Sequence, residues 1–454
     1  MSKKTLLVLA LMVSFSVNAQ VHIRSLPKAG YDRRIRDFVN SLEIVDTHEH
    51  LVNPETIKKD WPLDFMLLLN HYADDDIKSG GMPTVDFDNL LKDSLSVKDK
   101  WTKIAPYWLK ASNTAYTWSV LLTVQKLFGI DDLNSSTVEV LSEKIRHSYD
   151  NKADWFNKVL RDKCKIQYVV LDRDDRTYGD PEMFRYVKRF DNFINIDSWG
   201  EIKSLSKVYG VDIKSVDDLT ITLNIAFDKA LKECIVAVKT ALAYNRTLFY
   251  EEVEKEKAEA VFNQLKTLGG KVTLPFAEAK YLQDYMMHRL LELAGKSDMP
   301  VQVHTGLHAG EGNRIENANP VLLTNLFLKY PDVKFILFHG AYPYGGELSV
   351  LAKNFRNVYI DLCWLYIISP SYCERYLNEW LETVPVNKIM AFGGDFKNVE
   401  GVYGHQLIAR QVIANVLIEK VQGGYLSESE AMRIAQWILH DNAINVLSLE
   451  KNRT

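Results

Sequence analysis

The sequence lacks the cysteine motifs and basic runs that mark several classes of protein. Only four cysteines occur among 454 residues, and they form neither a CxxC pair nor a zinc-finger spacing. A chain of this length can bury a large core without disulfides, so we expect free, buried thiols, while a Cys363–Cys373 bridge stays open. Basic runs are also missing, and the formal net charge is −4. Nucleic acid is therefore not an expected partner.

Long apolar runs are missing too, except at the N-terminus. There, two lysines precede an apolar run over residues 6–17, and the small Ala19 follows. This pattern predicts a secretory signal peptide over residues 1–19, because the run is too short to span a bilayer. We expect a mature chain of residues 20–454, located in the periplasm or outside the cell, with no membrane contact after cleavage.

Residues 54–160 show little of the pattern of strands. Trp, Leu, Lys and Asp recur there at helical spacing, which predicts helices over residues 61–77, 100–130 and 135–160. A shorter helix is expected over residues 31–42. We therefore expect residues 54–160 to form a helical insertion, suited to act as a lid over a catalytic mouth.

Short apolar runs alternate with helical stretches in the rest of the chain. Eight strands are expected, near residues 43–48, 165–174, 193–198, 233–244, 299–306, 333–340, 357–363 and 388–396. Because such alternation implies parallel pairing, it predicts an α/β fold, a (β/α)8 TIM barrel with a long helical insertion after the first strand. The alternative is a doubly wound open sheet, which the lack of a GxGxxG motif after the first strand disfavours.

Residues with metal-binding or acid–base chemistry stand at the ends of the expected strands. His48 and His50 end the first strand, and their i, i+2 spacing aims both imidazoles at one face. The fourth, fifth, sixth and eighth strands carry, in this order, Lys239, His304, His339 and Asp395. Because active sites of TIM barrels form at the C-terminal strand ends, this distribution predicts a metal centre rather than scattered structural histidines.

The set His-x-His, Lys, His, His and Asp on these strands resembles the amidohydrolase superfamily, in its amidohydrolase-related branch. The resemblance covers nearly the whole mature chain. The segments "NHYADDDIKSGGM" and "FGIDDLN" are similar to the helical insertion of uronate isomerases, while "HTGLHAGEGN" and "FHGAYPYGGEL" are similar to metal-dependent hydrolases of the branch. The resemblance implies a metalloenzyme with a small-molecule substrate, and it does not choose between these activities.

Imidazole and carboxylate ligands suit a divalent metal, with zinc expected first and manganese or iron as alternatives. The expected ligands of one or two such ions are His48, His50, His304, His339, Asp395 and Lys239. As catalytic groups, Asp395 could accept the proton of a metal-activated water, and His339 could stabilise an oxyanion. By resemblance, Lys239 is either carboxylated and bridges two ions, or an uncarboxylated cation that faces the substrate.

Further residues are candidates for the wall of the pocket. Arg246 follows the fourth strand, and its planar guanidinium suits a substrate carboxylate, with a loop salt bridge as the alternative. Tyr344 and Trp364, together with Tyr342, could line the pocket or pack under a loop. Candidate lid or substrate contacts are His71, Tyr72 and Arg314. Expected surface or structural histidines include His147, His288 and His405.

These predictions favour an exported hydrolase that uses a metal-activated water and Asp395 to cleave an amide, ester or lactone of a small, oxygen-rich substrate. The alternatives are a uronate-type sugar-acid isomerase and a non-oxidative decarboxylase. A metal-containing binding protein is disfavoured, because the expected base is present. The sequence leaves open whether the protein forms a homo-oligomer.

Overall fold

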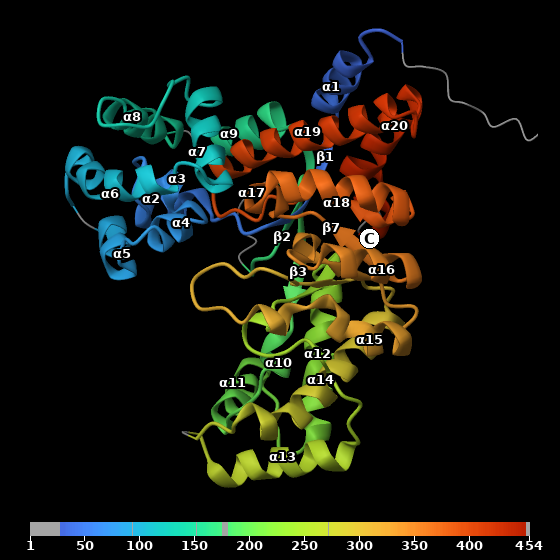
Figure 1. Cartoon of the computed structure of the whole chain (residues 1–454). Coiled ribbons are helices and arrows are strands. Elements are labelled where there is room, and N and C mark those ends of the chain that lie inside the picture. Colours follow the sequence, from blue (N-terminus) through green and yellow to red (C-terminus); the bar gives the residue numbers. More distant parts are fainter. Residues whose placement is uncertain (1–27, 93, 151, 175–179, 271, 451–454) are drawn as a thin grey trace, which may run out of the picture.

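The computed structural model describes residues 28–92, 94–150, 152–174, 180–270 and 272–450 (Figure 1). In this part of the chain, eight parallel strands form one sheet in the order β1 to β8. Their bounds are β1 (Ile44–Glu49), β2 (Ile166–Leu171), β3 (Phe184–Arg189), β4 (Ala237–Thr240), β5 (Val301–Val303), β6 (Phe335–Leu337), β7 (Val358–Asp361) and β8 (Ile389–Met390). The sheet curls into a barrel, in which Thr47 N donates to Phe392 O at 3.0 Å beyond the end of β8. The predicted TIM barrel is confirmed.

The strands are short and apolar because helices cover the sheet. Every residue of β1, β4, β5, β6 and β8 is buried, as expected for parallel strands enclosed on both faces. The helices that follow the strands are α10 (Asp191–Ile194), α11 (Trp199–Tyr209), α12 (Val216–Lys232), α13 (Lys255–Leu268), α14 (Phe276–Lys296), α15 (Thr324–Lys329), α16 (Gly345–Asn354), α17 (Leu365–Ile368), α18 (Pro370–Thr383) and α19 (Val399–Gln422). At the chain ends lie α1 (Tyr31–Ser41), α20 (Glu428–Gln436) and α21 (Asn442–Val446).

A run of helices separates β1 from β2. Its members are α2 (Pro54–Asp60), α3 (Met66–Leu69), α4 (Ala73–Ser79), α5 (Thr84–Lys92), α6 (Val97–Ala111), α7 (Ala115–Lys126), α8 (Val138–Ser148) and α9 (Lys152–Asn157). Figure 1 shows these helices, coloured blue to blue-green, gathered beside the barrel, where α7 packs against α19. We call this group the insertion.

The three long helices predicted in the insertion are each broken in two. The break between α6 and α7 has a local cause, because the Thr114 side chain accepts from Thr117 N and caps the new helix. Between α3 and α4, His71 and Tyr72 have positive φ angles of 101° and 77°. Because residues other than glycine rarely adopt positive φ angles, this break is a strained segment. His71 and Tyr72 face the mouth of the barrel.

The third strand was expected in the wrong place. Residues 193–198 were predicted as a strand, whereas β3 lies earlier in the chain. Residues 193–198 instead form the end of α10 and the segment that follows it. Arg185, Lys188 and Arg189 in β3 are partly exposed, so the strand lacks the apolar run that marks its neighbours. Phe193 and Ile194 are fully buried because α10 packs against α14, which explains the misleading apolar pattern.

Two predictions concern the chain ends and the cysteines. The predicted signal peptide, residues 1–19, lies outside the described residues. Among the helices of the described ranges, none is both long and apolar enough to cross a membrane. Cysteines 164, 234, 363 and 373 are all free, so the structure contains no Cys363–Cys373 bridge.

Candidate active site

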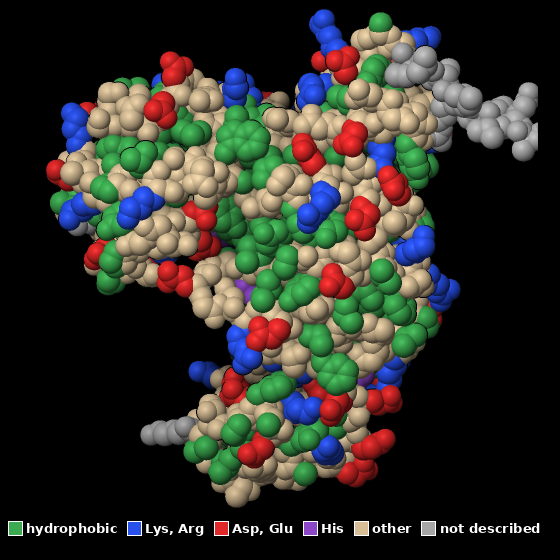
Figure 2. All heavy atoms as spheres, viewed as in Figure 1, with side chains coloured by type: hydrophobic (Ala, Val, Ile, Leu, Met, Phe, Trp, Pro, Cys, Tyr) green, Lys and Arg blue, Asp and Glu red, His purple; other side chains and the backbone are tan. Residues whose placement is uncertain are grey.

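A cavity of about 470 Å³ lies at the C-terminal ends of the barrel strands. Figure 2 shows the surface hollowed between the insertion and the barrel, with a histidine visible in the hollow. The cavity is lined by His48, His50, His71, Tyr72, Arg189, Asp191, Lys239, Ala241, Tyr244, Asn245, His304, Ala309 and Asp395. The structure thus brings the predicted strand-end residues to one place, with His339 joined to them through His304.

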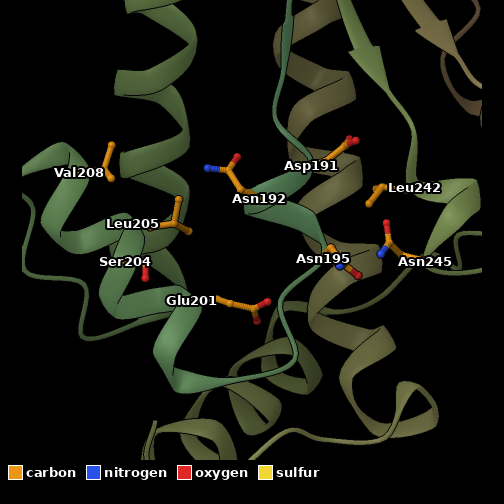
Figure 3. A pocket seen from close by; sticks show the side chains of 9 residues that line it. All are labelled: Asp191, Asn192, Asn195, Glu201, Ser204, Leu205, Val208, Leu242 and Asn245. Carbon is orange, nitrogen blue, oxygen red and sulfur yellow. The ribbon is translucent and has the colours of Figure 1, made fainter. Parts of the chain in front are cut away.

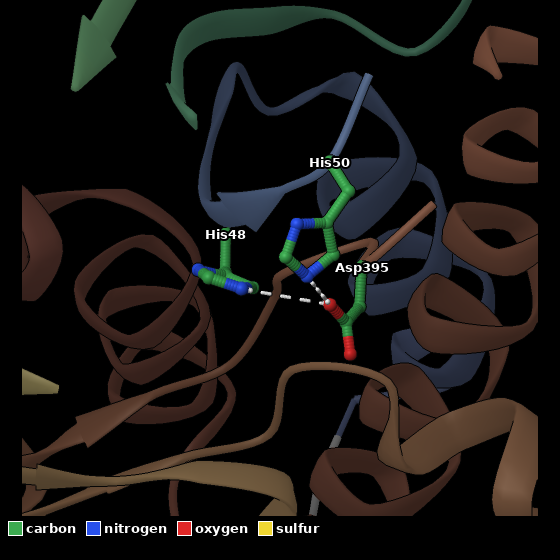
Figure 4. A group of neighbouring side chains, drawn as sticks. All are labelled: His48, His50 and Asp395. Carbon is green, nitrogen blue, oxygen red and sulfur yellow. Dashed lines mark ion pairs between the residues drawn. The ribbon is translucent and has the colours of Figure 1, made fainter. Parts of the chain in front are cut away.

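Three side chains converge in an arrangement that could hold a metal ion. His50 Nε2 lies 3.2 Å from Asp395 Oδ1, and His48 Nε2 lies 3.5 Å from the same oxygen (Figure 4). One ligand atom from each residue lies within 4.8 Å of the others. His48 Nδ1 is buried and has no hydrogen-bond partner in the described part of the chain. These donors fit a divalent ion, which the chemistry of imidazole and carboxylate also favours.

The protonation of this triad suits metal binding. Burial, together with the charge of Lys239, lowers the pKa of His48 well below its ordinary value, so its imidazole is neutral. Burial alone would raise the pKa of Asp395, but the hydrogen bond with His50 and the neighbouring imidazoles hold that pKa well below its usual range. A neutral imidazole and an ionised carboxylate are the forms that bind metal.

The backbone after β8 explains how Asp395 reaches the two histidines. Asp395 has a φ of 62°, and its N donates to His48 O at 2.9 Å. Gly394 N donates to Asp46 Oδ1 at 3.1 Å. A Cβ at Gly394 would lie 1.8 Å from Glu49 Oε1, so only glycine permits this approach to β1. The sequence "GGD" is therefore a packing requirement as well as a source of the carboxylate.

His304 and His339 form a second pair beside the triad. Their outer nitrogens, His304 Nε2 and His339 Nδ1, each lie 2.9 Å from a carbonyl oxygen, of Leu307 and Cys363 respectively. Carbonyls only accept, so both outer nitrogens donate. The inner nitrogens, 2.9 Å apart, then face each other as acceptors. Burial lowers the pKa of His339 to about 4, so its imidazole is neutral at neutral pH and its inner nitrogen is free to bind a metal ion.

A second group of candidate ligands consists of His339, Cys363 and Asp395, whose ligand atoms also lie within 4.8 Å of one another. Burial raises the pKa of the Cys363 thiol well above its ordinary value. A thiol must lose its proton to bind metal, so this group is a weaker site than the His48–His50–Asp395 triad.

Two cations stand in the same cavity. Lys239 is 1% exposed, its Nζ lies 3.6 Å from the centroid of the Phe338 ring, and burial lowers its pKa to about 8. Arg189 Nε donates to Asp172 Oδ2 at 2.7 Å. The ring face attracts an ammonium group, which favours the uncarboxylated form of Lys239.

Arg189 and Asp172 were missed in the sequence. Arg189 ends β3, the strand that was misplaced, so its position at the barrel mouth was hidden. Asp172 directly follows β2, and its Oδ2 lies 3.7 Å from His48 Nε2. The position of Asp172 at a correctly predicted strand end was a signal that could have revealed it.

The insertion reaches the site through one aromatic stack. The Tyr72 hydroxyl donates to Asp395 O at 2.8 Å, and the Tyr72 ring stacks on Trp364 with centroids 4.6 Å apart. Trp364 in turn stands perpendicular to His339 at 5.1 Å. Trp364 is therefore a buried support of the site, while Tyr72 and His71 form part of the cavity wall.

Three candidates for the pocket wall lie elsewhere. Arg246 is 3% exposed and donates to Gln283 and Asp284, so its guanidinium is occupied within the protein. The Tyr344 hydroxyl donates to Ile315 O at 3.2 Å. Arg314 is exposed and pairs with Glu316. The lining of the cavity includes none of these three side chains.

Three histidines that were expected to be structural or exposed, His288, His405 and His147, have partners outside the metal-ligand triad. His288 contacts Tyr330 Oη and Glu251 O, both at 2.8 Å. His405 is buried, with Nδ1 3.1 Å from Gly394 O, and His147 is exposed beside Asp150.

The chain is similar to known proteins over parts or most of its length. A family model described as Amidohydrolase matches residues 248–449. Protein fluG of Emericella nidulans is 28% identical over 234 residues, which cover 49% of this chain and only 27% of that longer protein. The uronate isomerase of Thermotoga maritima is 22% identical over 444 residues, covering 90% of this chain and 95% of that protein.

Solved structures show the same fold. The crystal structure of the Thermotoga maritima uronate isomerase has a TM-score of 0.73 at 19% identity, covering 92% of this chain and 97% of that chain. The glucuronate isomerase from Caulobacter crescentus has a TM-score of 0.73 at 17% identity, covering 95% and 97%. The family model over residues 248–449 and the shared fold support the amidohydrolase superfamily, with relatives of the uronate isomerase kind.

Proposed function

We propose that this protein is a metal-dependent isomerase of hexuronic acids. The observation that carries the proposal is a single cavity with a metal-ligand triad and two cationic side chains, Arg189 and Lys239. A hexuronate has a group for each of these features. Its carbonyl and neighbouring hydroxyl can bind the metal, and its carboxylate can bind the two cations. The similarity to uronate isomerases also extends over 90% of the chain, including the insertion.

The reaction moves protons and needs no oxidant or reductant. In the open-chain sugar acid, the proton on C2 moves to C1, and the proton of the C2 hydroxyl moves to the oxygen on C1. An aldehyde thereby becomes a primary alcohol while C2 becomes a ketone, so atoms and electrons balance. The protein must hold the carboxylate, polarise two neighbouring oxygens and pass protons between them.

The residues of the cavity can be assigned to these tasks. His48, His50 and Asp395 would hold a divalent ion, which when bound polarises the substrate carbonyl. The inner nitrogens of His304 and His339 would accept and return a proton. Arg189 and Lys239 would bind the carboxylate, because guanidinium and ammonium groups form strong charge-assisted hydrogen bonds with it. Tyr72 would exclude water from the insertion side.

The same triad could instead activate a water for hydrolysis, which was the first expectation from the sequence. Two cations in the cavity favour a substrate that carries a carboxylate, and the near full-length relatives bear the isomerase name. These two facts support the isomerase in preference to the hydrolase.

A direct assay tests the proposal. Protein loaded with zinc or manganese is incubated with glucuronate or galacturonate, and ketose formation is followed by NMR. We expect the ketose to form, and we expect Arg189→Met to raise KM by about tenfold or more through the loss of a charge-assisted hydrogen bond. Cleavage of a hexuronate lactone without any ketose would instead support the hydrolase.

The charge of Lys239 gives a prediction for pH dependence. Because burial lowers its pKa to about 8, Lys239 is protonated below pH 8 and loses its charge as pH rises through that value. If the charged form binds the carboxylate, KM should rise above pH 8 by up to about tenfold per pH unit. Initial rates measured from about pH 6 to about pH 10 follow this rise in KM, which is the alkaline limb of the pH profile.

Lys239→Ala provides the control for this titration. The variant should lose the alkaline limb and keep its metal content, measured by elemental analysis. If the variant lost metal together with activity, Lys239 would be a metal ligand, as in a carboxylated bridge between two ions.

A further inference from the structure

A second cavity adjoins the metal-site cavity and has no assigned role. It measures about 290 Å³, and Asp191 and Asn245 line both cavities. Figure 3 shows it between α11, which carries Glu201, Ser204, Leu205 and Val208, and the segments with Asn192, Asn195 and Leu242. A ligand that fills the first cavity can therefore extend into the second past Asp191 and Asn245.

The second cavity presents unused hydrogen-bonding groups. Asn192 and Asn245 are exposed and Asn195 is half-buried, and their side chains form no hydrogen bond within the described part of the chain, so their amides are open to a ligand. Asp191 Oδ2 accepts from Ala241 N at 2.9 Å, and the Thr240 hydroxyl lies near the same carboxylate, whereas Asp191 Oδ1 is shielded from solvent without a close hydrogen bond in the described residues. A buried carboxylate oxygen without a partner costs free energy, and a ligand that donates a hydrogen bond would remove this cost.

The charge of the lining restricts the ligand. Asp191 and Glu201 are carboxylates, and the residues that line this cavity include no lysine or arginine. Both cations of the site lie on the other side, in the first cavity. A second anionic group would therefore be disfavoured close to these carboxylates, while hydroxyl groups can donate to them and exchange hydrogen bonds with the three amides.

The sizes of the two cavities add a further argument. The first cavity, about 470 Å³, already lies within the range of about 300–1,000 Å³ typical of small-ligand sites. The second cavity is additional room, and Leu205, Val208 and Leu242 give it apolar surface on which a sugar ring can pack.

We propose that the second cavity is a subsite for a further sugar unit, so that the natural substrate is a hexuronate whose reducing unit lies at the metal site and whose next unit lies between α10 and α11. This inference rests on the proposed function, since it deepens the substrate class of the same site. The hydroxyls of the second unit donate to Asp191 Oδ1 and bond to the amides of Asn192, Asn195 and Asn245.

The test compares the binding of one-unit and two-unit acids by calorimetry, with galacturonate and rhamnosyl-1,4-galacturonate, whose second unit is neutral, as probes. Ser204→Phe fills the second cavity from α11 without altering a residue of the first cavity. Lys207→Phe is the matched control, because Lys207 is exposed on the same helix and does not line either cavity. The metal-loaded full chain is used throughout.

We expect the unmodified protein to bind rhamnosyl-1,4-galacturonate about tenfold more tightly than galacturonate, which corresponds to one or two net hydrogen bonds. Ser204→Phe should remove this difference, and Lys207→Phe should keep it. Equal affinities in the unmodified protein, or a difference that survives Ser204→Phe, would overturn the subsite.

These outcomes separate the two proposals. If galacturonate is isomerised but the second unit adds no affinity, the subsite is wrong and the proposed function stands. If neither acid is isomerised but the second unit adds affinity that Ser204→Phe removes, the subsite stands and the isomerase is wrong. If neither acid binds, both proposals are overturned.

Discussion

Asp395→Asn should reduce kcat/KM by about 10²–10⁴-fold, because it removes the charged ligand that would hold the metal ion against the substrate carbonyl. The carboxylate is the shared partner of His48 and His50, and its low pKa keeps it ionised. Asparagine has nearly the same shape but no charge, so it weakens metal binding and with it the polarisation of the substrate carbonyl. Steady-state kinetics and metal titration of the variant measure both effects.

The fold should survive this substitution. The backbone bond from Asp395 N to His48 O and the bond from Tyr72 Oη to Asp395 O do not involve the carboxylate. Asp361→Asn is a matched control, because Asp361 is a fully buried carboxyl at the end of β7 that does not line the cavity. The role of Asp395 would be refuted by a variant that keeps more than about a tenth of the activity with its metal bound.

The sequence predicted this part of the site because each residue lies next to a short apolar run. Once residues 43–48 and 388–396 are read as strands, the parallel barrel itself brings His48 and Asp395 to the same end. The contact was therefore predictable without knowledge of any side-chain direction. The same rule failed for Arg189, because β3 has charged, partly exposed residues and did not look like a strand.

Contacts made by the insertion could not be predicted from local patterns. The positive φ angles of His71 and Tyr72 arise at a break that helical periodicity does not reveal, and the bond from Tyr72 to Asp395 O joins residues far apart in the chain. The second cavity has the same origin, since it lies between α11 and residues that follow β3 and β4. Both features depend on how helices pack against the barrel.

Arg246 shows that the position of a residue after a strand does not predict the direction of its side chain. The position after β4 was predicted correctly, but the direction of the side chain is set by tertiary partners, chiefly Asp284 on α14. Arg246 Nη2 lies 2.6 Å from Asp284 Oδ1, and both side chains are 1% exposed. The guanidinium also lies over the Tyr250 ring, 4.2 Å from its centroid. The residue is a buried structural cation.

Arg246→Met should therefore lower the free energy of unfolding by about 3–5 kcal/mol, because it leaves Asp284 as a buried carboxylate without its partner. Urea denaturation measures this loss. KM for a hexuronate in the folded variant should stay within about twofold of the original value, since a residue that binds the substrate carboxylate would raise KM by about tenfold or more. The double variant Arg246→Met/Asp284→Leu should recover part of the lost stability, because replacing both partners removes the uncompensated charge. A large rise in KM with little loss of stability would mean that Arg246 leaves Asp284 and binds the substrate.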